Sequence, residues 1–211
     1  MAPDARGLQL EALHCERGAR VLFSGLSAAL QPGQLLRVQG ANGAGKTSLL
    51  RMICGLLPPT RGRVLWQGQG VVALREEFGR QLVYLGHAAA LKAELSPLEN
   101  LHAAAQLGGV APEQAAMLAA LRQAGLDRHE RAPVRVLSQG QRRRAALARL
   151  LLADRAPLWV LDEPFNALDV AATAWLIGVL EQHLARAGMV VLTSHQGVAL
   201  SPALPQVTVA L

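Results

Sequence analysis

The chain of 211 residues is poor in cysteine and in lysine. Its two cysteines, Cys15 and Cys54, form no CxxC pattern and build no disulfide framework, so we expect a reducing compartment. Nearly all of the positive charge is arginine, because the only lysines are Lys46 and Lys92. The net charge of +6 indicates an anionic partner, either a nucleotide, a nucleic acid or an anionic membrane surface, without choosing among them.

Long apolar runs are also missing. The mean hydropathy of +0.23 is high, yet no run approaches the ~18 residues that a membrane span needs. The N-terminal stretch MAPDARGLQLEAL lacks the apolar segment of a signal peptide. We therefore expect a cytoplasmic chain, part of whose apolar surface faces a partner.

Strand and helix patterns alternate along most of the chain. The expected strands are 8–15, 34–40, 62–68, 80–86, 156–164, 189–195 and 205–211. The expected helices are 47–57, 96–109, 111–125, the segment after SQGQ, and 171–188. This alternation predicts an α/β fold with a mainly parallel core sheet. We expect a single domain (1–211), with an α/β core at 1–87 and 137–211 and an inserted helical lobe at 88–136.

Residues 40–47 read GANGAGKT and match the pattern G-x-x-x-x-G-K-[ST] between an expected strand and an expected helix. Glycines let the backbone wrap closely around phosphates, and the helix N-terminus adds a favourable dipole. Lys46 should reach the β- and γ-phosphates, and the Thr47 hydroxyl should bind Mg²⁺. The alternative is a glycine-rich turn with a chance Lys-Thr. The expected nucleotide-binding residues here are Gly40, Ala41, Asn42, Gly43, Ala44, Gly45, Lys46, Thr47 and Ser48.

Two further expected strands deliver polar residues to their ends. LWVLDEP ends in Asp162, which we expect to hold Mg²⁺ directly or through water, and Glu163, which we expect to polarise an attacking water. Alone, the pair could equally be solvated acids in a turn. LTSHQ places His195 where it can bond a γ-phosphate, although a single histidine is more often a surface or core residue.

The motif SQGQ at 138–141 has two interpretations. Ser138 and Gln141 have the spacing of a capping box, in which each side chain bonds the other residue's backbone N–H. The same helix start presents free N–H groups and a positive dipole end to a phosphate. The four letters alone do not decide between a cap and a phosphate contact.

Taken in order, these motifs resemble those of the nucleotide-binding subunits of ABC transporters. In that family a P-loop, an LSGGQ signature, a Walker B strand, a D-loop and a switch histidine follow one another. Here they read GANGAGKT, LSQGQ, LWVLDEP, ALD and TSH, and the resemblance spans nearly the whole chain. It implies an ABC-type P-loop NTPase fold with N-terminal antiparallel strands, and an ATPase that uses ATP and Mg²⁺.

The resemblance also implies a head-to-tail homodimer. Two ATP molecules would lie between the P-loop of one subunit and the signature of the other. Asp169, within ALD, would stand in the D-loop across the interface. The signature residues expected at the partner's ATP are Leu137, Ser138, Gln139, Gly140 and Gln141.

Three residues depart from the family pattern. His87 stands where the family usually has the Q-loop glutamine, and it is a candidate ligand of Mg²⁺ or its water. Arg17 stands where an aromatic ring often stacks on adenine, and a guanidinium plane can stack there instead. Gln139 replaces a signature glycine, and we expect its side chain to point away from phosphate.

Further stretches narrow the resemblance: CERGARVLFSGLS, VLWQG, LSPLENL, APLWVLDEPFNALD and LTSHQ. They look like the ATP-binding subunits of haem exporters in bacterial cytochrome c maturation. This implies that ATP hydrolysis drives haem export or release of a haem chaperone. The expected partners are integral membrane permease subunits, with this chain peripheral on the cytoplasmic face of the inner membrane.

Two other functions remain open at this stage, an ATPase of a different exporter and a soluble ABC-type ATPase that acts on nucleic acid. A regulatory protein that holds ATP without turnover is a third. The run Arg142, Arg143 and Arg144 suggests nucleic acid, but we expect these residues to line the helix after the signature, partly solvated, and expect no nucleic-acid partner.

Overall fold

The computed structural model describes residues 7–153, 155–194 and 204–211, which form two compact units. Of the described residues, the first unit draws on 7–84, 156–162, 181–194 and 204–211, and the second on 85–153, 155 and 163–180. The second unit is larger than the helical lobe expected from the sequence. The reason is that the helix after the signature packs with that lobe, through Ala145 and Ala148.

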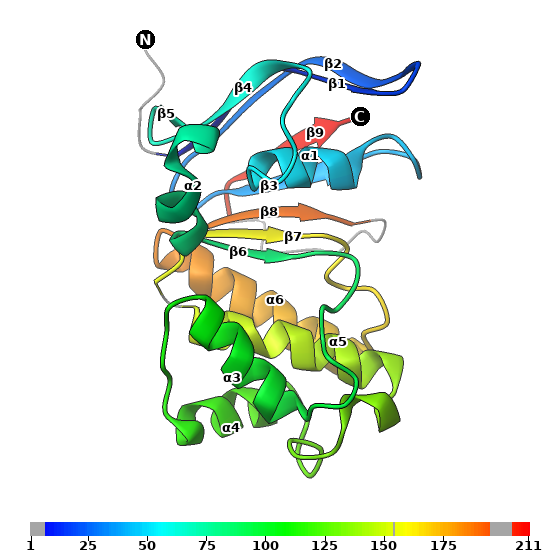
Figure 1. Cartoon of the computed structure of the whole chain (residues 1–211), viewed down its shortest axis with the longest axis vertical. Coiled ribbons are helices and arrows are strands. Elements are labelled where there is room, and N and C mark those ends of the chain that lie inside the picture. Colours follow the sequence, from blue (N-terminus) through cyan, green and yellow to red (C-terminus); the bar gives the residue numbers. More distant parts are fainter. Residues whose placement is uncertain (1–6, 154, 195–203) are drawn as a thin grey trace. The chain divides into compact units, whose positions relative to one another are not determined.

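The first unit contains a five-stranded sheet in the order β6-β7-β8-β3-β9 (Figure 1). The strands β7, β8, β3 and β9 run parallel, so their carboxyl ends lie at one edge. Every residue of β7 and β8 is buried, as expected of central strands covered on both faces. The bounds are β3 Leu35–Gln39, β6 Leu82–Leu85, β7 Leu158–Leu161, β8 Met189–Thr193 and β9 Gln206–Ala210.

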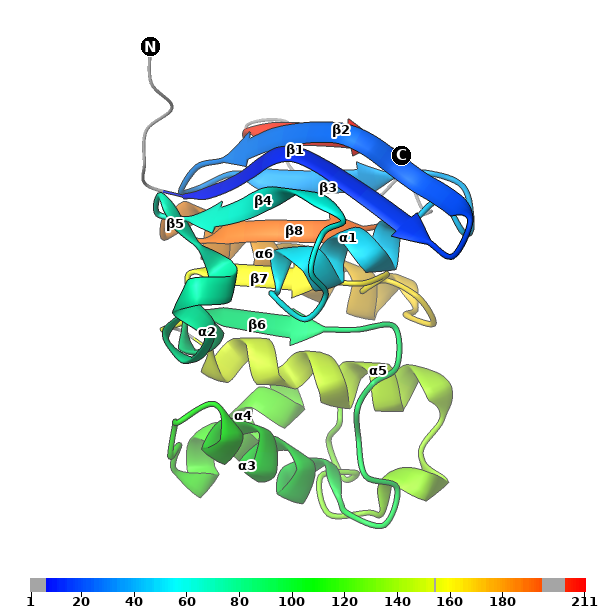
Figure 2. The ribbon, with the colours of Figure 1, turned by 45° about the horizontal axis from the view of Figure 1, so that its top comes forward.

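The first unit also contains an antiparallel sheet in the order β2-β1-β4-β5. Its strands are β1 Leu8–Arg17, β2 Arg20–Leu30, β4 Arg61–Trp66 and β5 Gln69–Gly70. The helix α1 (Lys46–Ile53) lies between the two sheets (Figure 2), and one hydrophobic core joins all three elements. Trp66 and Phe78 pack together in this core, with ring centroids 5.5 Å apart. Phe78 belongs to α2 (Val71–Arg80), which has non-helical backbone angles at Arg75.

The second unit is helical, with its own core of leucine, alanine and methionine side chains. Its elements are α3 Pro97–Leu107, α4 Gln114–Gln123, α5 Gln139–Leu147, the first part of α6 (Val170–Ala185), and the short 3-10 helices η1 Val134–Val136 and η2 Ala148–Leu152. Two helices begin with capping boxes: Ser138 with Gln141 for α5, as predicted from the sequence, and Ser96 with Glu99 for α3. In the part of the chain that the structure describes, no helix is long and apolar enough to cross a membrane.

Candidate functional site

The carboxyl ends of three neighbouring parallel strands carry the residues of the first unit that the sequence predicts to bind phosphate. The strand β3 leads into Gly40 of the loop GANGAGKT, β7 ends before Asp162, and β8 ends at Thr193. Because β8 lies between β7 and β3, the loop and both polar residues meet at one edge of the sheet. Such an edge is where open α/β sheets bind ligands.

The loop before α1 has the backbone geometry of a phosphate cradle. Gly43 and Gly45 adopt φ angles of 79° and 106°, which L side chains rarely adopt. A Cβ atom on Gly45 would lie 3.1 Å from Cβ of Leu22 and from Cδ1 of Phe23, so close packing also disfavours a larger residue here. Around Gly43 there is open space, which leaves room for a phosphate to approach the backbone.

Lys46 begins α1 and turns back over the loop. Its Nζ donates hydrogen bonds to the carbonyl oxygens of Gly40 (2.8 Å) and Ala41 (3.2 Å). The ammonium group therefore lies inside the loop, beside the first-turn N–H groups of α1 that lack intrahelical acceptors. One positive charge and several amide donors converge there, an arrangement that fits the phosphates of a nucleotide.

Asp162 is buried and receives a hydroxyl at each carboxylate oxygen. Thr47 Oγ1 donates to Oδ2 at 2.8 Å, and Thr193 Oγ1 donates to Oδ1 at 2.8 Å. Carboxylate and hydroxyl oxygens are the donors that Mg²⁺ prefers, so the side chains of Thr47 and Asp162 fit this ion. The pairing of Thr47 with Asp162 agrees with the roles expected from the sequence, whereas Thr193 was not recognised there.

Other side chains surround this edge. Burial raises the pKa of Tyr84, and the Asp162 carboxylate raises it further, while a hydrogen bond from Arg51 acts in the opposite direction. Burial also raises the pKa of Cys15, and the charge of Arg17 and the hydroxyl of Ser48 partly offset this effect. Arg17 ends β1, and its side chain is exposed.

The signature residues lie at the start of α5 in the second unit. Ser138 Oγ accepts the Gln141 N–H at 3.2 Å, and Gln141 Oε1 accepts the Ser138 N–H at 2.8 Å. Ser138 and Gln139 are exposed, whereas Leu137 is buried and anchors the turn. A Cβ atom on Gly140 would lie 2.8 Å from the carbonyl oxygen of Ala167, so this position requires glycine.

The segment from Glu163 to Asp169 also belongs to the second unit. Glu163 and Ala167 have φ angles of 49° and 62°, in the left-handed region that non-glycine residues rarely adopt. Asp169 caps α6, because its Oδ1 accepts the Ala172 N–H at 2.7 Å. Within one chain, the Asp169 side chain therefore acts as a helix cap. The contact of Asp169 across a dimer interface remains a prediction.

His87 and the arginine run are the other expected features that the structure describes. His87 is exposed and follows β6 in the second unit, where its carbonyl oxygen accepts a bond from Arg143 Nη1 at 3.5 Å. His195 lies outside the described residues. We expected Arg143 to be partly solvated, but its side chain is only 6% exposed. The sequence-based prediction did not recognise that this arginine is buried.

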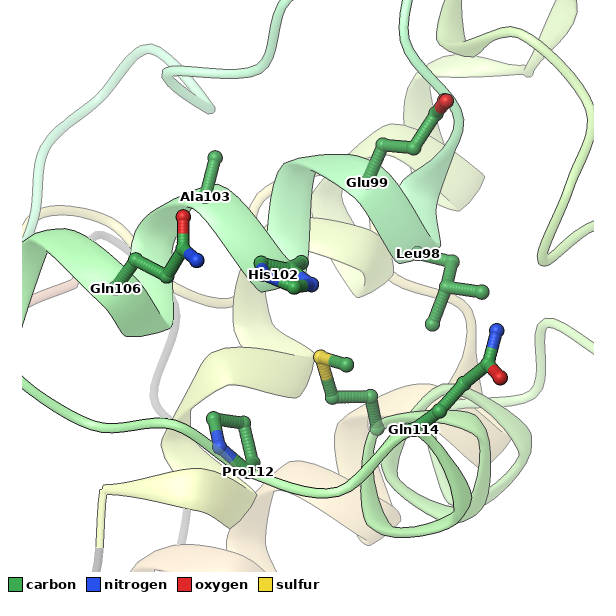
Figure 3. A pocket seen from close by; sticks show the side chains of 8 residues that line it. Leu98, Glu99, His102, Ala103, Gln106, Pro112 and Gln114 are labelled. Carbon is green, nitrogen blue, oxygen red and sulfur yellow. The ribbon is translucent and has the colours of Figure 1, made fainter.

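A separate pocket of about 480 Å³ lies between α3 and α4 (Figure 3). Leu98, Pro112 and Met117 give it an apolar lining, and Glu99 and His102 lie around it. It has no glycine-rich loop and no strand ends. Within the described ranges, no group of three or more His, Cys, Asp or Glu side chains is arranged to hold a metal ion.

Comparisons with known proteins agree with this geometry. The sequence profile of the ABC transporter family matches residues 23–166. The cytochrome c biogenesis ATP-binding export protein CcmA of Dechloromonas aromatica is 52% identical over 191 residues, which cover 90% of this chain and 93% of that protein. The protein of the same name from Methylococcus capsulatus is 54% identical over 185 residues, which cover 88% of this chain and 89% of that protein.

A solved structure supports the fold independently. It is a dimeric ATP-binding cassette in a post-hydrolysis state, bound to ADP and Pi, with a TM-score of 0.78 and 22% identity. The similarity covers 90% of this chain and 88% of that one. The chain therefore belongs to the ABC transporter family, among the ATP-binding export proteins of cytochrome c biogenesis.

Proposed function

We propose that this chain binds and hydrolyses ATP at the edge formed by β3, β7 and β8, and that it drives a membrane exporter that serves cytochrome c maturation. The observation that carries the proposal is the arrangement at Asp162. Two hydroxyls hold its carboxylate beside the loop that contains Lys46. A buried carboxylate, two hydroxyls and a lysine are unusual components of a hydrophobic core, and together they suit a magnesium-bound triphosphate.

The chemistry follows from the side chains. Backbone N–H groups of the loop and Lys46 would hold the β- and γ-phosphates and stabilise the charge that develops on them. Thr47 and Asp162 would hold Mg²⁺, which neutralises phosphate charge when bound. Glu163 would orient the attacking water and accept its proton, and His195 would donate to the γ-phosphate. His87 would contribute a ligand to Mg²⁺ or its water, and Arg17 would stack on the base.

The functional form that we propose is a pair of identical subunits. The cassette with the similar fold is dimeric, and a two-fold axis makes both ATP sites equivalent. The exposed start of α5 would then contact the γ-phosphate held by the partner through Ser138 and the free N–H groups of the helix. ATP binding would favour the closed pair, and hydrolysis would release it.

The exporter partner is inferred from the relatives, which are named for cytochrome c biogenesis and export. We infer that membrane subunits handle haem, and that this chain is peripheral to them on the cytoplasmic side. The arginines after the signature have acceptors within the chain, so their run gives no specific support to a nucleic-acid partner. Arg142 donates to the Arg135 carbonyl at 2.7 Å and Arg144 to the Gly125 carbonyl at 2.9 Å, while Arg143 is buried.

The hydrolytic role is tested with Glu163→Gln in the full-length chain. We expect the single-turnover rate of ATP hydrolysis to fall about 100-fold or more, since a general base contributes that much. ATP binding should remain, and the variant should accumulate as a closed pair by size-exclusion chromatography with ATP and Mg²⁺. Glu76→Gln, an exposed glutamate on α2, is the matched control. A wild-type rate in Glu163→Gln would refute the role of Glu163.

The exporter role needs a separate experiment. The tagged chain, purified from its own membranes in detergent, should bring down integral membrane proteins that contain haem, detected by pyridine haemochrome absorbance and mass spectrometry. Recovery of a permease without haem would assign the chain to a different exporter. The ATPase assignment would survive that result.

A further inference from the structure

We propose that Arg143 is a positioning residue for ATP hydrolysis, which holds the backbone of Glu163 and the turn that carries His87 against the signature helix. Arg143 lies on α5, and its guanidinium group is buried in the second unit. It donates to four carbonyl oxygens in two segments that are distant in sequence. The acceptors and distances are Glu163 (2.8 Å), Gly86 (3.2 Å), Pro164 (3.3 Å) and His87 (3.5 Å).

The contact with Glu163 is the shortest of the four, and it falls on a strained residue. The φ angle of Glu163 is 49°, a conformation that persists only where the surroundings stabilise it. A charged donor at 2.8 Å from its carbonyl oxygen fixes the orientation of that peptide group. The direction in which the Glu163 side chain leaves the backbone therefore depends on Arg143.

The second pair of acceptors belongs to the turn after β6. The carbonyl oxygens of Gly86 and His87 both accept from Nη1 of Arg143, while Nη2 donates to residue 163 and Nε to residue 164. The guanidinium carries donors on three nitrogens in one plane, which lets this single side chain bond both segments. Burying a charged guanidinium costs free energy, because the group loses its hydrogen bonds to water. The four carbonyl contacts replace those hydrogen bonds.

The helix that carries Arg143 begins with the signature. Its capping box and its buried alanines do not involve the guanidinium group, so the start of α5 keeps its structure without it. Arg143 thus links the residue that we expect to activate water with the segment that we expect to contact the partner's ATP. This inference rests on the proposed function, because it assigns a support to Glu163.

The test compares Arg143→Gln and Arg143→Lys with Arg144→Gln in the full-length chain, together with the membrane proteins that co-purify with it. Arg144 is the matched control, because it lies on the same helix and donates to a carbonyl at the end of α4. We expect Arg143→Gln to lower kcat about tenfold or more, since small misplacements of a reacting group cost that much. The KM for ATP should change little, because the P-loop belongs to the other unit. The kcat of Arg143→Lys should lie between those of the wild type and Arg143→Gln. This variant provides the test if Arg143→Gln does not fold.

A second readout separates positioning from general support. The double variant Arg143→Gln/Glu163→Gln should still form the ATP-dependent closed pair that Glu163→Gln forms. Loss of that pair would mean that Arg143 supports the whole second unit, and this would overturn the inference. A kcat of Arg143→Gln equal to that of Arg144→Gln would also overturn it. If instead Glu163→Gln itself hydrolyses ATP at the wild-type rate, the role of Glu163 is refuted and the inference with it, while the ATPase assignment stands.

Discussion

Thr193 Oγ1 donates a hydrogen bond to Oδ1 of Asp162 at 2.8 Å, and both side chains are buried. Thr193 ends β8, and Asp162 directly follows β7, the neighbouring parallel strand. Thr47 approaches the other carboxylate oxygen from the start of α1. Thr193 therefore holds one face of the carboxylate and leaves the other directed toward the hydroxyl that we expect at Mg²⁺.

Replacing Thr193 with valine keeps the shape of the side chain and removes this donor. We expect the free energy of unfolding to fall by about 1–3 kcal/mol, because a buried acceptor loses a hydrogen bond. The Mg²⁺ concentration needed for half-maximal ATP binding should rise. Urea unfolding and a nucleotide-binding titration measure the two effects. Thr193→Ser keeps the hydroxyl and is the control; if it behaves like Thr193→Val, the hydrogen bond is not the cause.

The two capping boxes allow the cap to be separated from the phosphate contact. Ser96 and Ser138 accept the N–H three residues later at the same distance of 3.2 Å. Replacing either with alanine should cost about 1 kcal/mol of stability, measured by urea unfolding. Only Ser138→Ala should also weaken ATP-dependent pairing and slow hydrolysis. Equal effects of both variants on pairing would show that Ser138 acts as a cap alone.

Local signals explain which parts of the fold the sequence predicted. The capping boxes at Ser96 and Ser138 depend on residues only three positions apart, and the P-loop motif lies between two recognisable elements. The strand β2 was missed because its burial alternates only over residues 26–30, and its pairing with β1 is evident only in three dimensions. The helix α2 was missed as well, and its backbone is irregular at Arg75.

Arg143 shows why part of the site escaped prediction. Three consecutive arginines read alike, but successive helical residues are about 100° apart, so only one of them can face inward. A signal was available, since Ala146, Leu147 and Leu150 follow Arg143 at helical spacings and are all buried. Thr193 gave a weaker signal, because threonine is common in strands whether or not its hydroxyl has a partner.

The two cysteines should be unreactive in the folded chain. Burial raises the pKa of the Cys54 thiol, and it also raises that of Cys15, with the charge of Arg17 and a hydrogen bond to Ser48 acting in the opposite direction. A raised pKa leaves less thiolate at pH 8, and the thiolate is the reactive form. A disulfide reagent such as DTNB should label the native chain slowly and both thiols rapidly in urea. Fast labelling of native protein would contradict the burial of these side chains.

Gly45 is the position in the P-loop where backbone and packing requirements coincide. Alanine there would need a φ of 106°, and its Cβ would lie 3.1 Å from atoms of Leu22 and Phe23. We expect Gly45→Ala to weaken ATP binding about tenfold or more, equivalent to about 1.4 kcal/mol, because the loop must shift away from the phosphates. Isothermal titration calorimetry with MgATP measures this change. Gly25→Ala is the control, since Gly25 has a φ of 70° in open space and carries the strain without the crowding. If both variants bind ATP equally well, the packing of Gly45 against β2 does not shape the cradle.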